Sequence, residues 1–255
     1  MTAFALAVAT LWWRECVRFF RDRSRAVSAI VTAVLFWVLI GFGLGGSFSP
    51  AGMPGRMGSV EYLYPGTIVF VVLLSAIVGT FSLIQDRREG FLQGVLVAPI
   101  PRSAIALGKV LGGTTIALLQ GALLLPLAPF LGIPWTAGGF VAALAALFLI
   151  AFAFTALGFV LAWRMESIQG FHGIVNLVLM PMWFLSGALF PVEGAARGLA
   201  AMMRANPVTY GLAAFRGALY SGSASVPAAG AGAWVVTAGF AAFAFGLAVH
   251  AARGR

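Results

Sequence analysis

The sequence is poor in charged residues. Only 9% of its 255 residues are Asp, Glu, Lys or Arg, whereas soluble proteins carry about a quarter. Hydrophobic residues make up 61% of the chain, and its mean hydropathy is +1.00. A single water-soluble core cannot bury so many apolar side chains, so this composition excludes a soluble globular fold and predicts a membrane protein.

Cysteine and histidine are also scarce, which limits the possible chemistry. The single cysteine, Cys16, excludes an internal disulfide framework and a multi-cysteine metal site. His172 and His250 are far apart and belong to no His-Glu-x-x-His motif. The polar side chains within 166–172 could hold a proton or a metal, but a cluster of charges at the end of a helix explains them as well. We therefore expect no catalytic or metal site, with a membrane-embedded enzyme as an alternative.

The chain has one lysine, which bears on ATP binding. A phosphate-binding P-loop needs Gly-x-x-x-x-Gly-Lys-Ser/Thr, and Lys109 is followed by Val110. Active transport would therefore draw its energy from another polypeptide or from an ion gradient. A gradient-driven secondary transporter is a second alternative, although neither a buried carboxylate relay nor a repeated helix break is evident.

Long apolar segments predict an all-α polytopic fold. A membrane-spanning helix needs about 20 apolar residues, and the sequence offers six such segments in one transmembrane domain, 1–255. The expected spans are 26–44, 65–84, 104–125, 137–163, 168–190 and 230–250.

The basic residues predict the orientation, since cytoplasmic loops retain Lys and Arg. With both termini in the cytoplasm, 12 basic residues lie inside and 4 outside. This predicts a multi-pass protein of a bacterial or archaeal cytoplasmic (inner) membrane. The net charge of +9 then reflects the basic residues that keep the cytoplasmic segments on their side of the membrane. Nucleic acid is not an expected partner, because binding it needs an exposed basic groove.

Segment 1–25 predicts an amphipathic helix at the membrane surface. Four arginines recur at helical spacing on one side, and aromatic residues lie on the other. These arginines would bind the phosphates of membrane lipids, although a plain positive-inside anchor is an alternative. They are Arg14, Arg18, Arg21 and Arg25.

Segment 86–102 lies between two expected spans and is charged at both ends. Phe91, Leu92, Val95 and Leu96 share one face of a short helix, which prolines then end. The segment predicts a solvent-facing helix on which a soluble partner could act. The alternative is an amphipathic loop on the bilayer.

Segment 181–216 is interrupted repeatedly by proline and glycine. Pro181, Gly187, Pro191 and Asn206-Pro207 predict a chain that re-enters the membrane interface as short helices. Irregular backbone at membrane depth needs protein or a water-filled cavity around it. This region is therefore expected over a translocation path, with a simple surface hairpin as the alternative.

Two blocks of sequence resemble the type-2 ABC exporter permeases. The first is Asp-Arg-Arg-Glu-Gly-Phe-Leu-Gln-Gly-Val-Leu-Val-Ala-Pro-Ile-Pro-Arg-Ser from Asp86, with Leu-Gly-Lys ending at Lys109. The second is Met-Pro-Met-Trp-Phe-Leu-Ser-Gly-Ala-Leu-Phe-Pro from Met180, followed by Asn-Pro-Val-Thr-Tyr-Gly from Asn206 and by Phe215-Arg216. The blocks are similar to the drug-exporter and nodulation-factor-exporter branches.

The resemblance implies a transport subunit that dimerises with a second copy or a paralogue. It also implies a separate cytosolic P-loop ATPase, which binds ATP and Mg, whereas this chain binds no cofactor. Segment 86–102 would be the coupling helix. Gln93 departs from the family, which commonly has a carboxylate there. The implied coupling residues are Arg87, Arg88, Glu89, Gly90, Leu92, Gln93, Val97, Pro99 and Pro101.

Polar and aromatic residues within the spans are candidates for a substrate path, although hydrogen bonds between helices explain most such polar residues. The scarcity of charge in the spans predicts a hydrophobic or amphiphilic cargo, such as a drug, a lipid or a lipid-linked glycan. The candidates are Gln120, Asn176, Met180, Trp183, Phe184 and Ser186.

Overall fold

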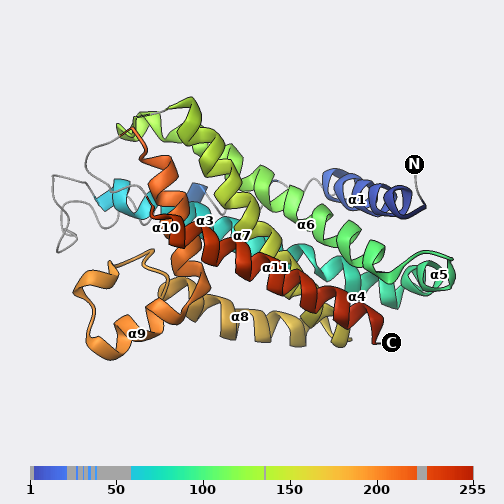
Figure 1. Ribbon diagram of the computed structural model, residues 1–255. Helices are drawn as coiled ribbons and strands as arrows, with labels where there is room; N and C mark the ends of the chain where they lie inside the picture. Colours follow the sequence, from blue (N-terminus) through green and yellow to red (C-terminus); the bar gives the residue numbers. More distant parts are fainter. Residues whose placement is uncertain are drawn as a thin grey trace.

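The computed structural model is an elongated bundle of helices (Figure 1). It describes residues 3–21, 59–134, 136–222 and 229–254, with five isolated positions between 27 and 38. Helices are the only regular secondary structure in these residues, so the predicted all-α class is confirmed for them. The expected span at 26–44 lies outside the described residues, apart from those isolated positions.

Four stretches of the described chain are long and apolar enough to cross a membrane. They run from Val60 to Arg88, from Arg102 to Leu127, from Ala137 to Arg164 and from Ala231 to Arg253. The first contains α3 (Ser59–Gly79) and α4 (Phe81–Arg88), the second α6 (Arg102–Leu124) with η2 (Leu125–Leu127), and the others are α7 (Ala137–Arg164) and α11 (Ala231–Arg253). All four match expected spans to within a few residues.

The segment expected to span at 168–190 forms a shorter helix, α8 (Ile168–Phe184). Ser167 caps its start, where the Ser167 hydroxyl accepts a hydrogen bond from the Gly170 amide at 3.2 Å. The helix ends near Pro181, and Gly187 adopts φ +85°, a conformation that glycine tolerates best. These features end α8 six residues before the predicted boundary.

Helix α7 lies at the centre of the bundle and contacts α3, α6, α10 and α11. Alanines on α7 and α11 provide much of this packing, because small side chains let helix backbones approach closely. Gly113 of α6 serves the same purpose, since a Cβ at this position would lie 2.6 Å from the Thr155 Cγ2 atom.

Segment 181–216 forms short helices, of which α10 packs against α3. They are η4 (Val192–Gly194), α9 (Arg197–Ala205) and the beginning of α10 (Pro207–Leu219). Asn206 joins α9 to α10: its Oδ1 accepts from the Val208 amide, and its Nδ2 donates to the Met182 carbonyl at 2.6 Å. Tyr62 of α3 donates to the Gly187 carbonyl at 3.0 Å. Helix α10 is largely buried against α7 and α11.

Helix α1 (Ala3–Arg21) packs along the first half of α6 and runs in the same direction. Two glycines of α6 make room for it. A Cβ on Gly108 would lie 2.8 Å from the Leu11 Cβ, and one on Gly112 would lie 2.6 Å from the Glu15 Cβ. Trp12 adds a hydrogen bond to the Thr115 hydroxyl at 3.0 Å. Glycines four residues apart thus form the α1 docking surface of α6.

Candidate functional site

The amino-terminal end of α1, helix α5 (Phe91–Val97) and the carboxyl end of α11 lie at one end of the bundle (Figure 1). The predicted coupling segment 86–102 forms the end of α4, a turn, α5 and an extended link to α6. The turn uses Gly90 with φ +77°, and the Glu89 and Gly90 amides donate to the carbonyls of Gln85 and Arg87. The turn at Gly90 ends α4 and directs the chain into α5.

The outer side of α5 and its flanks is accessible to a partner. Val97 is 84% exposed, and Arg88, Glu89, Gln93, Pro99 and Pro101 are also exposed. Leu92 differs from the prediction: its side chain is 3% exposed and belongs to the hydrophobic core. Leu92 therefore anchors α5 to the bundle and cannot form an outward contact in this conformation.

Arg87 and Arg88 connect α4 to the segment between α7 and α8. The Arg87 guanidinium donates to the carbonyls of Trp163 at 2.6 Å and Met165 at 2.9 Å. Arg88 donates twice to the carbonyl of Glu166, at 2.7 and 3.0 Å. These carbonyls lie in the last turn of α7 or directly after it, where a cation is favourable. Both arginines thus have partners within the chain, and their contact with an ATPase stays a prediction.

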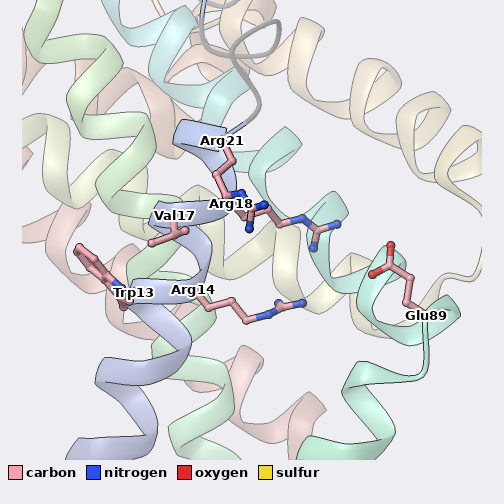
Figure 2. A pocket seen from close by; sticks show the side chains of 6 residues that line it. All are labelled: Trp13, Arg14, Val17, Arg18, Arg21 and Glu89. Carbon is pink, nitrogen blue, oxygen red and sulfur yellow. The ribbon is translucent and has the colours of Figure 1, made fainter.

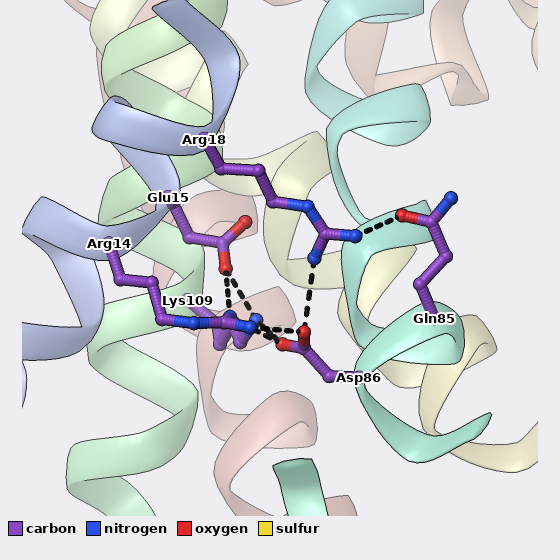
Figure 3. A network of polar contacts seen from close by, with 6 residues as sticks. All are labelled: Arg14, Glu15, Arg18, Gln85, Asp86 and Lys109. Atoms are coloured by element: carbon purple, nitrogen blue, oxygen red, sulfur yellow. Dashed lines mark hydrogen bonds and ion pairs between the residues drawn. The ribbon is translucent and has the colours of Figure 1, made fainter. Parts of the chain in front are cut away.

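A network of charged side chains joins α1, α4 and α6 (Figure 3). Its centre is Asp86, which is 0% exposed. Arg14 binds both Asp86 oxygens, at 2.8 and 2.9 Å, and Arg18 binds one of them at 3.0 Å. Lys109 of α6 donates to Asp86 and also to Glu15, the latter at 2.5 Å. Each buried charge therefore has an oppositely charged partner.

Arg14 extends this network to α5. Its guanidinium carbon lies 3.7 Å from the centre of the Phe91 ring, within the range of a cation–π interaction. Burial alone would lower the pKa of Arg14, but the hydrogen bonds and charge of Asp86 outweigh it and raise this pKa. Arg14 therefore stays charged and contacts α4 and α5 together.

The predicted membrane-surface arginines fall into three groups. Arg14 and Arg18 bind Asp86, so much of their hydrogen-bonding capacity is used within the protein. Arg21 is exposed at the end of α1, and Arg25 lies outside the described residues. The outer side of α1 instead exposes apolar residues, including Trp13 and Phe20. The membrane-surface role of the four arginines stays a prediction.

The candidate path residues differ in their exposure and in their contacts. Gln120, Trp183 and Ser186 are buried; Trp183 donates to the Gly66 carbonyl at 2.9 Å, and Ser186 to the Trp183 carbonyl at 2.6 Å. Asn176 and Phe184 are exposed on the outer side of α8, and Met180 is half-buried. Their role in a substrate path therefore stays a prediction.

Composition and spacing did not predict the charge network, because its members are distant in sequence. Arg14 and Asp86 are 72 residues apart, and Glu15 and Lys109 are 94 apart. One signal was available, since Lys109 lies inside the expected span 104–125, where an ionisable residue needs a partner. The resulting arrangement is a mechanical junction: side chains connect α4 to α1, α6 and the α7–α8 segment, and Phe91 of α5 contacts Arg14 of α1.

These features define a multi-pass helical membrane protein with a short exposed helix braced at one end of the bundle. The ABC-2 type transporter family matches residues 7–220. The chain belongs to this family, and the predicted resemblance is confirmed. Members are membrane subunits of ABC transporters.

Similar proteins cover most of the chain. Inner membrane transport permease YadH of Escherichia coli is 23% identical over 218 residues, which is 85% of this chain and 84% of that protein. Putative transport permease ycf38 of Cyanophora paradoxa is 26% identical and covers 81% of this chain and 72% of its own length. Nodulation protein J of Sinorhizobium fredii is 29% identical over 189 residues, 71% of this chain and 69% of that protein.

Proposed function

We propose that this chain is the membrane subunit of an ATP-driven exporter in a cytoplasmic (inner) membrane, with both termini in the cytoplasm. A separate cytosolic P-loop ATPase would bind ATP and Mg and act on α5. The observation that carries this proposal is the exposed side of α5, with Val97 84% exposed on a helix anchored by Leu92 and Arg14. A large apolar side chain at the tip of a braced helix suits a protein interface.

The proposed coupling follows from the contacts of α4 and α5. Displacement of α5 would act on α8 through Arg87 and Arg88 and on α1 through Arg14. In this proposal the bundle has six spans, α1 lies at the membrane interface and segment 181–216 is re-entrant. The cargo would be hydrophobic or amphiphilic, in keeping with the apolar spans.

The first test is co-purification of the ATPase in mild detergent from the native membrane, followed by mass spectrometry. Val97→Asp should reduce the bound P-loop ATPase roughly tenfold or more, because the interface would bury an unpaired charge. The matched control is Phe130→Asp in η3 (Pro129–Leu131), which changes a similarly exposed apolar side chain outside α5. Equal ATPase recovery with both variants would contradict the coupling role of α5. Absence of an ATPase from the unmodified protein would favour a gradient-driven carrier or an enzyme.

We also propose that α8 faces a second permease copy. Its outer side is apolar, with Leu177 76% exposed and Ile174, Val178 and Phe184 also exposed. In the Cys16→Ser background, Leu177→Cys should form an intermolecular disulfide in membranes under mild oxidation, since a symmetric contact brings like residues together. Val235→Cys on the exposed side of α11 is the control. Cross-linking at 235 without cross-linking at 177 would assign the contact to α11.

A further inference from the structure

An open groove of about 730 Å³ lies between α1 and the turn that precedes α5 (Figure 2). One wall is the arginine stripe of α1, and the Glu89 carboxylate lies across the groove from it. The lining residues are Trp13, Arg14, Val17, Arg18, Arg21 and Glu89.

The groove and its adjoining network have an excess of positive charge. Four basic groups, Arg14, Arg18, Arg21 and Lys109, accompany the three carboxylates of Glu15, Asp86 and Glu89, which leaves one positive charge. Arg21 takes part in no ion pair among the described residues. A phosphate group near Arg21 would supply an anionic partner for this arginine.

The rim of the groove is apolar. Trp13 is 62% exposed, and Val17 lines the same side. Tryptophan is enriched at the headgroup level of membranes, where its ring contacts acyl chains and its N–H contacts polar groups. Guanidinium groups match phosphate oxygens in geometry and charge. Basic and aromatic surfaces side by side therefore suit a ligand with a phosphate and an apolar chain.

We propose that this groove binds the phosphodiester headgroup of a membrane phospholipid. Arg21 binds the phosphate, the charge of Arg18 adds to the attraction, and the first carbons of an acyl chain pack on Trp13 and Val17. Glu89 lies across from the arginines, so a headgroup with an ammonium, such as phosphatidylethanolamine, fits better than phosphatidylglycerol. Because Glu89 belongs to the turn before α5, the bound lipid contacts the elements that α5 would move.

The test measures lipid binding to the full-length purified protein by native mass spectrometry with added phosphatidylethanolamine. Arg21→Gln should weaken binding of one lipid about fivefold, the usual effect of one basic residue near a membrane surface. Trp13→Ala should weaken it as well. Both positions lie outside the Asp86 network, so the fold is retained. The controls are Arg164→Gln, at an exposed arginine on α7, and Phe20→Ala, at an exposed aromatic on α1 outside the groove.

Two further measurements, with a different lipid headgroup and with inorganic phosphate as a competitor, distinguish a lipid site from a free-phosphate site. Glu89→Gln should reduce the preference for phosphatidylethanolamine over phosphatidylglycerol, as expected if Glu89 contacts the ammonium. Inorganic phosphate at millimolar concentration should fail to displace the lipid; displacement would show a free-phosphate site and overturn the proposal. Unchanged lipid binding in Arg21→Gln and Trp13→Ala would also overturn the proposal. This holds even if these variants no longer bind a partner protein. The site does not depend on an ATPase, so its failure is separable from failure of the proposed coupling.

Discussion

Asp86→Asn is expected to lower the free energy of unfolding by about 3–5 kcal/mol, the usual cost of removing one partner from a buried ion pair. Asp86 is fully buried and accepts hydrogen bonds from three cationic side chains. The amide cannot balance their charge, and its NH₂ group would point donors at other donors. Lys109, itself buried, would keep only Glu15 as a charged partner.

Thermal unfolding in detergent, followed by tryptophan fluorescence, measures this effect. Glu166→Gln is the control, because Glu166 is exposed and binds Arg88 through its carbonyl; its unfolding free energy should change by less than about 0.5 kcal/mol. Adding Lys109→Met to Asp86→Asn should recover part of the loss, because it removes one of the cations that Asp86 no longer balances, while Glu15 keeps Arg14 as an ion-pair partner. Equal stability of Asp86→Asn and the unmodified protein would show that the network contributes little.

Gly112→Val is expected to displace α1 from α6 and to expose Cys16. A Cβ at Gly112 already meets the Glu15 Cβ at 2.6 Å and its Cγ at 2.9 Å, and the valine methyl groups need further space. Burial raises the pKa of the Cys16 thiol, and the charge of Glu15 adds to this shift. Since the thiolate is the reactive form, labelling of the docked helix is slow. Overpacking costs about 1–3 kcal/mol, so opening of α1 and labelling should accelerate roughly 5- to 150-fold.

Maleimide labelling in native membranes measures the rate at the single cysteine of the chain. Gly239→Val on α11 is the matched control, because a Cβ there has no neighbour within 4 Å. It should label at the unmodified rate. Slow labelling of Gly112→Val, at the rate of Gly239→Val, would mean that α6 yields locally and keeps α1 in place.

The long helices could be predicted because their signal is local. An uninterrupted apolar stretch determines α6, α7 and α11, whose observed ends lie within a few residues of the expected ones. The end of α8 was less accessible to prediction, since 185–190 is as apolar as the helix before it. Pro181 and Gly187 predicted a break in this region but not the residue at which the helix ends, and the bond from Tyr62 to the Gly187 carbonyl, which holds the turn after it, appears only in the folded chain.

The site illustrates the same limit. Spacing alone predicted a short amphipathic helix after Glu89, and α5 occupies that place. Spacing places Leu92 on the apolar face of α5, and only the family resemblance implies a contact of Leu92 with the ATPase; in the folded chain its side chain is buried. The partners Asp86 and Lys109 could not be identified from spacing, because pairing across 23 to 94 residues leaves no periodic pattern.

The separation of Glu15 from Lys109 also has a consequence for synthesis. Chains grow at about 5–20 residues per second, so roughly 5–20 s pass between the two residues. During that interval Glu15 lacks Lys109, the buried cation that it binds in the folded protein. Helix α1 cannot complete its docking until α4 and α6 have been made. Helix α1 therefore reaches its final position only after α6 has left the ribosome, and the junction that it forms with α4 and α6 can close before α7 to α11 have been made.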